Sequence, residues 1–118
     1  MRAHTRCPVL SVEVVGDVIM VRFIGRAGLG EENVRDVGEE LLRLVEERRP
    51  RRLDVSFGGV EYLTGAGLGA LVTLHRTLRD RGGRLVLVHV GPRPYEALAA
   101  TGLHTLLDVR QDGAEGEP

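Results

Sequence analysis

The chain has 118 residues, 42% of them hydrophobic, and its sixteen basic residues, all Arg, face seventeen acidic ones for a formal net charge of −1. This length predicts a single domain, and the near-neutral charge excludes a global field that would attract nucleic acid or anionic lipid. The absence of Lys excludes a Schiff-base or phosphate-loop lysine, and the single cysteine, Cys7, excludes an internal disulfide and a multi-cysteine zinc site.

We expect no targeting segment at the start of the chain. No apolar core follows the first seven residues, because Glu13 and Asp17 come too soon. All apolar runs are far shorter than the ~20 residues of a membrane-spanning helix. We therefore expect a soluble, cytoplasmic protein with a flexible start at residues 1–8, a domain at 9–110, and a disordered, acidic, glycine-rich tail at 111–118.

Two runs rich in β-branched residues, 9–15 and 18–24, are separated by the turn signal Gly16-Asp17 and predict an antiparallel hairpin. Residues 25–30 are predicted to form a loop. A helix is predicted from Glu31 to about Arg49, because apolar residues recur there at helical spacing. The residues of this apolar stripe are Val34, Val37, Leu41, Leu44 and Val45.

In the second half of the chain, short strands alternate with helices. Thr64 is predicted to cap a helix that runs from about Gly65 to Asp80 and ends before Gly82-Gly83. Its apolar stripe is Leu68, Leu71, Val72, His75 and Leu78. The other predicted elements are a strand at Leu53–Phe57, a central strand at Arg84–Val90, a short helix from Pro92 or Pro94 through Thr101, and a last strand at Thr105–Val109.

The predicted order of elements is therefore β-β-α-β-α-β-α-β. Consecutive β-α units predict parallel strands joined by right-handed crossovers, with an antiparallel hairpin strand at one side. The expected fold class is α/β, a single domain with a mixed, mostly parallel sheet of four to five strands and three helices.

Two short motifs are more specific than the rest of the sequence. Asp54-Val55-Ser56 ends a strand, and Gly67-Leu68-Gly69 opens the next helix. In this order they resemble the signature of STAS domains, the family of bacterial anti-sigma factor antagonists and of the cytoplasmic tails of sulfate transporters. The turn Arg81-Gly82-Gly83-Arg84-Leu85 and Thr101-Gly102-Leu103 also look like the family, so the resemblance covers about Val9 to Val109 and implies a STAS-type fold.

The resemblance implies a protein-binding regulator of transcription that works by partner switching and has no catalytic activity. The partner-binding residues that it implies are Thr64, Gly65, Ala66, Gly67, Leu68 and Gly69. The expected partner is an anti-sigma factor of the serine-kinase type. The alternative is an ABC ATPase, with the chain as the STAS subunit of a lipid or solute transporter complex.

The sequence departs from the family at its phosphorylation motif. In the family, a partner kinase modifies a Ser at the helix start, and the added charge prevents docking. Here Thr64 stands in place of an Asp, Gly65 in place of the phosphorylated Ser, and Ala66 in place of a second Ser or Thr. An earlier family motif, Gly-Glu-Leu-Asp, reads Gly25-Arg26-Ala27-Gly28 and lacks its Asp. We therefore predict that the chain is not phosphorylated at the usual position, where only Thr64 offers a hydroxyl.

Enzymatic interpretations of the same residues are weaker. Gly65–Ala70 can be written as a dinucleotide-binding G-x-G-x-x-A, but the preceding connection is too long for the tight turn of that motif. Ser56, His89 and Asp54 could form a catalytic triad, but Ser56 lies inside a predicted strand without a nucleophile elbow. Asp54 and Ser56 are instead predicted to be structural residues at the strand end, with Asp54 accepting hydrogen bonds from loop N–H groups.

The remaining polar residues predict no ligand. His75 lies on an apolar helical stripe and is expected to pack there. The cluster Arg48–Arg52 is flanked by Glu46 and Glu47 and contains no aromatic residue, so we expect it to serve the helix C-terminus and solubility. We expect no cofactor, no metal, no nucleic acid and no direct insertion into a membrane.

Overall fold

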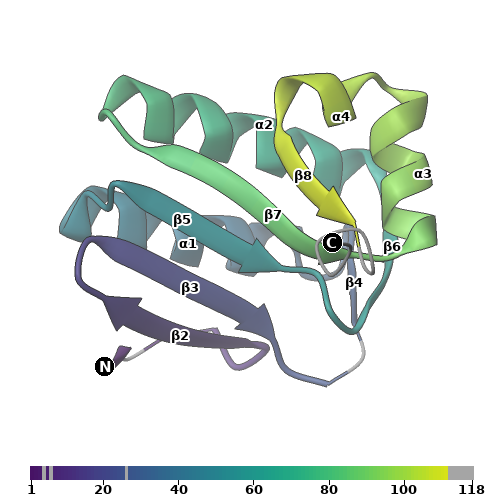
Figure 1. Cartoon of the computed structure of the whole chain (residues 1–118). Coiled ribbons are helices and arrows are strands. Elements are labelled where there is room, and N and C mark those ends of the chain that lie inside the picture. The colour runs from purple at the N-terminus through teal and green to yellow at the C-terminus, as the bar shows by residue number, and fades with distance from the viewer. Residues whose placement is uncertain (4, 6, 26, 112–118) are drawn as a thin grey trace, which may run out of the picture.

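The computed structural model of the chain describes residues 1–3, 5, 7–25 and 27–111. Its main sheet has six strands in the order β1-β2-β3-β5-β7-β8, and β4 pairs with β6 in a separate two-stranded sheet (Figure 1). The strands are β1 (Arg2–Ala3), β2 (Leu10–Val15), β3 (Val18–Phe23), β4 (Ala27–Leu29), β5 (Arg52–Ser56), β6 (Val60–Leu63), β7 (Arg84–Val90) and β8 (Asp108–Gln111). The helices are α1 (Val34–Arg48), α2 (Gly65–Asp80), α3 (Pro92–Ala100) and α4 (Leu103–Leu106).

The predicted single α/β domain is confirmed, and so is its hairpin. β2 and β3 are antiparallel, and Val15 pairs with Val18 at the turn. Gly16 has a φ of 62°, a left-handed conformation that explains the glycine in this two-residue turn. β3, β5, β7 and β8 are parallel neighbours, as the β-α units predict.

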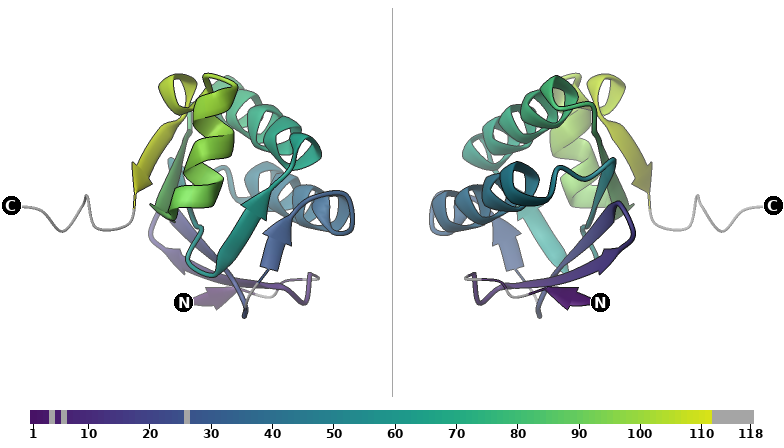
Figure 2. Two further views of the ribbon diagram at one scale, coloured as in Figure 1. Left: turned by 90° about the vertical axis from the view of Figure 1, so that its right-hand side faces the viewer. Right: turned by 90° about the vertical axis from the view of Figure 1, so that its left-hand side faces the viewer.

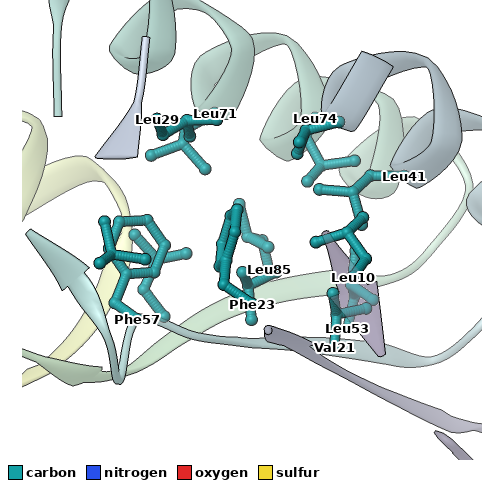
Figure 3. Close-up of a cluster of buried hydrophobic side chains, with 14 of the residues drawn as sticks. Leu10, Val21, Phe23, Leu29, Leu41, Leu53, Phe57, Leu71, Leu74 and Leu85 are labelled. Carbon is teal, nitrogen blue, oxygen red and sulfur yellow. The ribbon is translucent and has the colours of Figure 1, made fainter. Parts of the chain in front are cut away.

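The helices cover only one face of the main sheet. Figure 2 shows α1, α2 and α3 on the same side, with α4 at the β8 edge. The core lies between this face and the helices, where sheet residues meet residues of α1 and α2 (Figure 3). Phe23 and Phe57 pack edge to face there, with ring centroids 6.0 Å apart. In the described part of the chain, no helix lies on the other face of the sheet.

Four parts of the chain differ from the sequence prediction. The predicted loop 25–30 contains β4, and the predicted connection 58–63 contains β6. Thr105, predicted to start the last strand, lies in α4, and β8 begins at Asp108. The short β1 pairs with β2 in the segment that was expected to be flexible. Strands of two to four residues show no readable period, because their pairing depends on contacts distant in sequence. The predicted acidic tail lies outside the described residues after Gln111.

Candidate partner-binding site

Thr64 begins α2 as its N-cap, as predicted. Its Oγ1 accepts a hydrogen bond from the N–H of Gly67 over 3.4 Å and donates one to the carbonyl oxygen of Leu29 over 3.4 Å. Its backbone N–H donates to the same carbonyl over 3.0 Å. Thr64 therefore satisfies one free donor of the helix start and also fixes that start to the end of β4.

The small β4–β6 sheet places the starts of α1 and α2. A side chain at Gly28 would occupy the position of the Tyr62 ring, and a Cβ at Gly30 would lie 2.8 Å from Cγ2 of Thr64. Asn33 braces the loop before α1, because its Oδ1 accepts from the N–H of Gly30 over 3.2 Å and its Nδ2 donates to the Gly28 carbonyl over 2.8 Å. The close approach of these segments needs glycine at both positions.

The three glycines at the start of α2 differ in their surroundings. Gly67 is buried, and a Cβ there would lie 2.5 Å from the Leu29 carbonyl oxygen and 2.9 Å from Cδ1 of Leu63. Gly65 and Gly69 are exposed, and beyond their own helix nothing in the described part of the chain lies within 4 Å of their Cβ positions. Packing therefore explains why position 67 is a glycine, but it does not explain the glycines at positions 65 and 69.

The first turn of α2 also presents backbone donors to solvent. The N–H of Gly67 is bound by Thr64 Oγ1, and that of Leu68 donates to the Thr64 carbonyl over 2.9 Å. The N–H groups of Gly65 and Ala66 precede these and have no acceptor in the described segments. The helix carries no acidic residue in its first turn, so nothing on α2 itself neutralises this end of its dipole.

An acidic rim, formed by the exposed residues Glu31, Glu32 and Glu61, lies beside this helix start. The Tyr62 hydroxyl donates a hydrogen bond to the Glu32 carboxylate, and this bond lowers the pKa of Glu32 below its ordinary 4.5. The same bond raises the pKa of Tyr62, with smaller contributions from the charges of the three glutamates. The Glu32 carboxylate therefore stays ionised at neutral pH.

Asp54 and Ser56 lie on the sheet face that the helices leave bare, not near Thr64. Asp54 is buried, and its Oδ1 lies 2.9 Å from Nε of Arg52, two residues earlier on the same face. The prediction that Asp54 accepts from loop N–H groups is thus wrong, because its Oδ2 accepts a hydrogen bond from Nη2 of Arg52 over 3.1 Å. Ser56 does act at the strand end, since its Oγ accepts from the N–H of Gly58 over 3.3 Å.

The other candidate residues of the sequence do not assemble into a site. His75 is half-buried, and burial lowers its pKa, with help from Arg79 and Arg76. Burial raises the pKa of the Cys7 thiol. Within the described ranges, no three His, Cys, Asp or Glu side chains are grouped to hold a metal ion. Over the same residues, none of the helices combines the length and apolar character needed to cross a membrane.

The sequence model of the STAS domain matches residues 10–116 of the chain. The chain belongs to the STAS domain family. Solved structures with low sequence identity to the chain have a similar fold. One is an anti-sigma-factor antagonist (STAS) domain protein from Planctomyces limnophilus, with a TM-score of 0.75 at 19% identity, over 90% of this chain and 92% of that one.

Two further solved structures are similar to the chain in fold. A sulfate transporter family protein from Wolinella succinogenes matches with a TM-score of 0.67 at 24% identity, over 83% of this chain and 80% of that one. The Bacillus cell fate determinant SpoIIAA in its phosphorylated form matches with a TM-score of 0.63 at 16% identity, over 87% and 92%. At these identities the likeness concerns the fold alone.

The structure places all six residues that the STAS resemblance singled out, Thr64 to Gly69, in the cap and first turns of α2. Gly67 and Leu68 are buried, so the residues that reach the surface are Thr64, Gly65, Ala66 and Gly69. The supporting residues Leu29, Asn33 and Tyr62 were not predicted. Only the close spacing of Gly28 and Gly30 in the sequence could have indicated a tight approach of the chain there.

Proposed function

We propose that this chain is a non-catalytic STAS-domain regulator that captures a protein partner through the helix-start surface formed by Thr64, Gly65, Ala66 and Gly69. The observation that carries the proposal is the open space around Gly65 and Gly69. A glycine inside a helix costs about 1 kcal/mol relative to alanine, and at Gly69 no contact of the fold explains that cost. Bare backbone at the surface lets another protein approach closely and reach the outward-facing N–H groups.

An apolar groove between α1 and α2 extends this surface. It has a volume of about 300 Å³, and apolar side chains of both helices form most of its lining. Gly38 of α1 and Ala70 of α2 both line it, and Gly38 also has open space around its Cβ position. Apolar contact at the centre with a polar rim is the usual composition of a protein–protein interface. The groove would supply the apolar centre of such an interface, and the acidic rim would supply its polar edge.

We also propose that phosphorylation at the helix start does not control this binding. Gly65 has no hydroxyl, and the hydroxyl of Thr64 both donates to Leu29 and accepts from Gly67. A phosphate on Thr64 would break the cap and add about −1.5 to −2 charge units next to the acidic rim. The chain would therefore differ from SpoIIAA, whose phosphorylated form is a known structure.

The proposed partner is an anti-sigma factor of the serine-kinase type, which would make the chain a cytoplasmic antagonist in a partner-switching pathway. An ABC ATPase is the alternative partner. The absence of a hydroxyl at Gly65 favours this alternative, because an accessory transporter subunit needs no phosphorylation, and a sulfate transporter family protein shares the fold.

The test is affinity capture from the native host with the wild-type chain, Gly69→Asp and the control Ala100→Asp, which adds the same carboxylate to the exposed end of α3. We expect wild type and control to retain one protein that Gly69→Asp loses. A captured protein with a serine-kinase domain supports the first partner, and an ABC ATPase supports the second. If Gly69→Asp, shown to be folded by circular dichroism, captures the same protein equally well, the helix-start surface is not the contact.

A further inference from the structure

The main sheet has one face on which no helix of the described chain lies, although Asp54 and Ser56 on that face are buried. β3, β5, β7 and β8 are parallel, and all long helices lie on the opposite side (Figure 2). Parallel strands are almost always covered on both faces, because the crossover connections and the hydrophobic strands favour it. β2 and β3 at one side of this sheet are antiparallel, and antiparallel strands commonly leave one face to solvent, so the bare face is accessible to a partner there.

The strand register defines which side chains share the bare face. Glu13 of β2 pairs with Met20 of β3, and Ser11 pairs with Arg22, so these four residues form one small rectangle. Met20 is 44% exposed although it is a large apolar side chain on a strand. It therefore offers an apolar centre with charged and hydroxyl groups beside it.

Most charges on this face are already paired within the chain. Arg52 lies 2.9 Å from Asp54, and Asp108 lies 3.6 Å from Arg84 and 3.5 Å from Arg110. Glu13 and Arg22 form no ion pair or hydrogen bond through their side chains within the described segments. The face thus has the carboxylate of Glu13 and the guanidinium of Arg22 beside the exposed Met20, and Arg2 of β1 lies opposite Glu13 on the same face.

We propose that a second copy of this chain covers the bare face, in a two-fold dimer in which Glu13 of each copy pairs with Arg22 of the other. A two-fold axis that runs in the interface close to the Ser11–Met20 diagonal exchanges the positions of Glu13 and Arg22. It brings the two Met20 side chains together on the axis. Two opposite charges on one patch are self-complementary under such an axis, as an isologous interface requires.

The spacing of the strands determines how the copies cross. Neighbouring strands are about 4.8 Å apart, and residues two positions apart on one strand are separated by about 6.8 Å. An axis along the diagonal of that rectangle makes the strands of the two copies cross at a large angle. This corresponds to the orthogonal class of sheet packing. The start of α2 lies on the helical side, so the dimer leaves both helix-start surfaces free for partners.

The test measures the molecular mass by sedimentation velocity at concentrations up to about 1 mM, which detects dissociation constants as weak as the millimolar range. Wild type is expected to show a concentration-dependent dimer. Arg22→Glu places two carboxylates opposite each other, and Glu13→Arg places two guanidinium groups opposite each other, so each variant alone is expected to be monomeric. Arg93→Glu, the same charge change on α3, is the control and is expected to dimerise like wild type.

The decisive arm mixes Arg22→Glu with Glu13→Arg in equal amounts. In a heterodimer of these two variants both contacts are again between opposite charges, so dimerisation is expected to return. This recovery also shows that both variants are folded. A monomeric wild type, dimeric single variants, or a mixture that stays monomeric would each overturn the proposal, and none of these results bears on the helix-start surface.

Discussion

The two glycines Gly67 and Gly69 allow one substitution to be compared at neighbouring positions of one helix. We predict that Gly69→Ala stabilises the chain, because a methyl group there meets open space and alanine avoids the entropic cost of glycine in a helix. The expected gain in the free energy of unfolding is about 0.5–1 kcal/mol. In a chain of this size it corresponds to a rise in Tm of about 2–5 °C.

Gly67→Ala is predicted to act in the opposite direction. Its Cβ would lie 2.5 Å from the Leu29 carbonyl oxygen, which is backbone that β4 and the Thr64 hydrogen bonds hold in place. Overpacking of this kind costs about 1–3 kcal/mol. The loss exceeds the helical gain of alanine, so a net destabilisation is expected.

Thermal and urea unfolding of wild type, Gly67→Ala and Gly69→Ala, followed by circular dichroism, would measure both effects. Gly69→Ala should unfold at higher temperature than wild type and yet bind the partner more weakly, because its methyl group covers the exposed backbone. If Gly67→Ala stabilised the chain as much as Gly69→Ala, the close approach of β4 to α2 would be refuted. If Gly69→Ala bound the partner as tightly as wild type, the functional reason for that glycine would fail.

Three further predictions concern the surroundings of the site and the core. Thr64→Ala should lower the free energy of unfolding by about 1 kcal/mol, whereas Thr64→Ser, which keeps the cap oxygen, should stay near wild type in urea unfolding. Tyr62→Phe removes the hydrogen bond to Glu32, so an NMR titration should show the carboxyl pKa rising toward 4.5. In wild type, the lowered folded-state pKa means that this contribution to stability is present above about pH 4.5 and is lost as the pH falls through the folded-state value. Arg43→Met should destabilise the chain by about 1–3 kcal/mol, because it removes a guanidinium 2.5 Å from the buried Glu40 carboxylate, whereas Glu40→Gln together with Arg43→Met should recover part of the loss.

The sequence predicted those elements whose signal is local. The hairpin at Gly16-Asp17, the helix from Gly65 to Asp80 and the strand from Arg84 to Val90 each follow from periodicity, caps and turn residues within one segment. These elements form much of the main sheet and of the helical layer that covers one of its faces. The cap at Thr64 was also predicted, because a hydroxyl residue directly before a helical pattern is a local signal for an N-cap.

The support of the site could not be predicted in the same way. β4 and β6 exist because Ala27 pairs with Val60, and the Thr64 hydroxyl has its second partner on Leu29. Neither contact leaves a pattern within one segment. The glycine motif alone also does not distinguish Gly67, which packing requires, from Gly69, which it does not. Only the position of the Leu29 carbonyl in the folded chain shows which of the two glycines packing requires.

The claim that the surface at the start of α2 captures a protein partner without being modified is tested most directly by calorimetric titration of the captured partner. Wild type, Gly69→Asp and Ala100→Asp are titrated in the presence of ATP, and the intact mass of the chain is measured afterwards. The account predicts tight binding by wild type and Ala100→Asp, no binding by Gly69→Asp, and an unchanged mass. Equal affinity of Gly69→Asp, or a phosphate on Thr64, would contradict it.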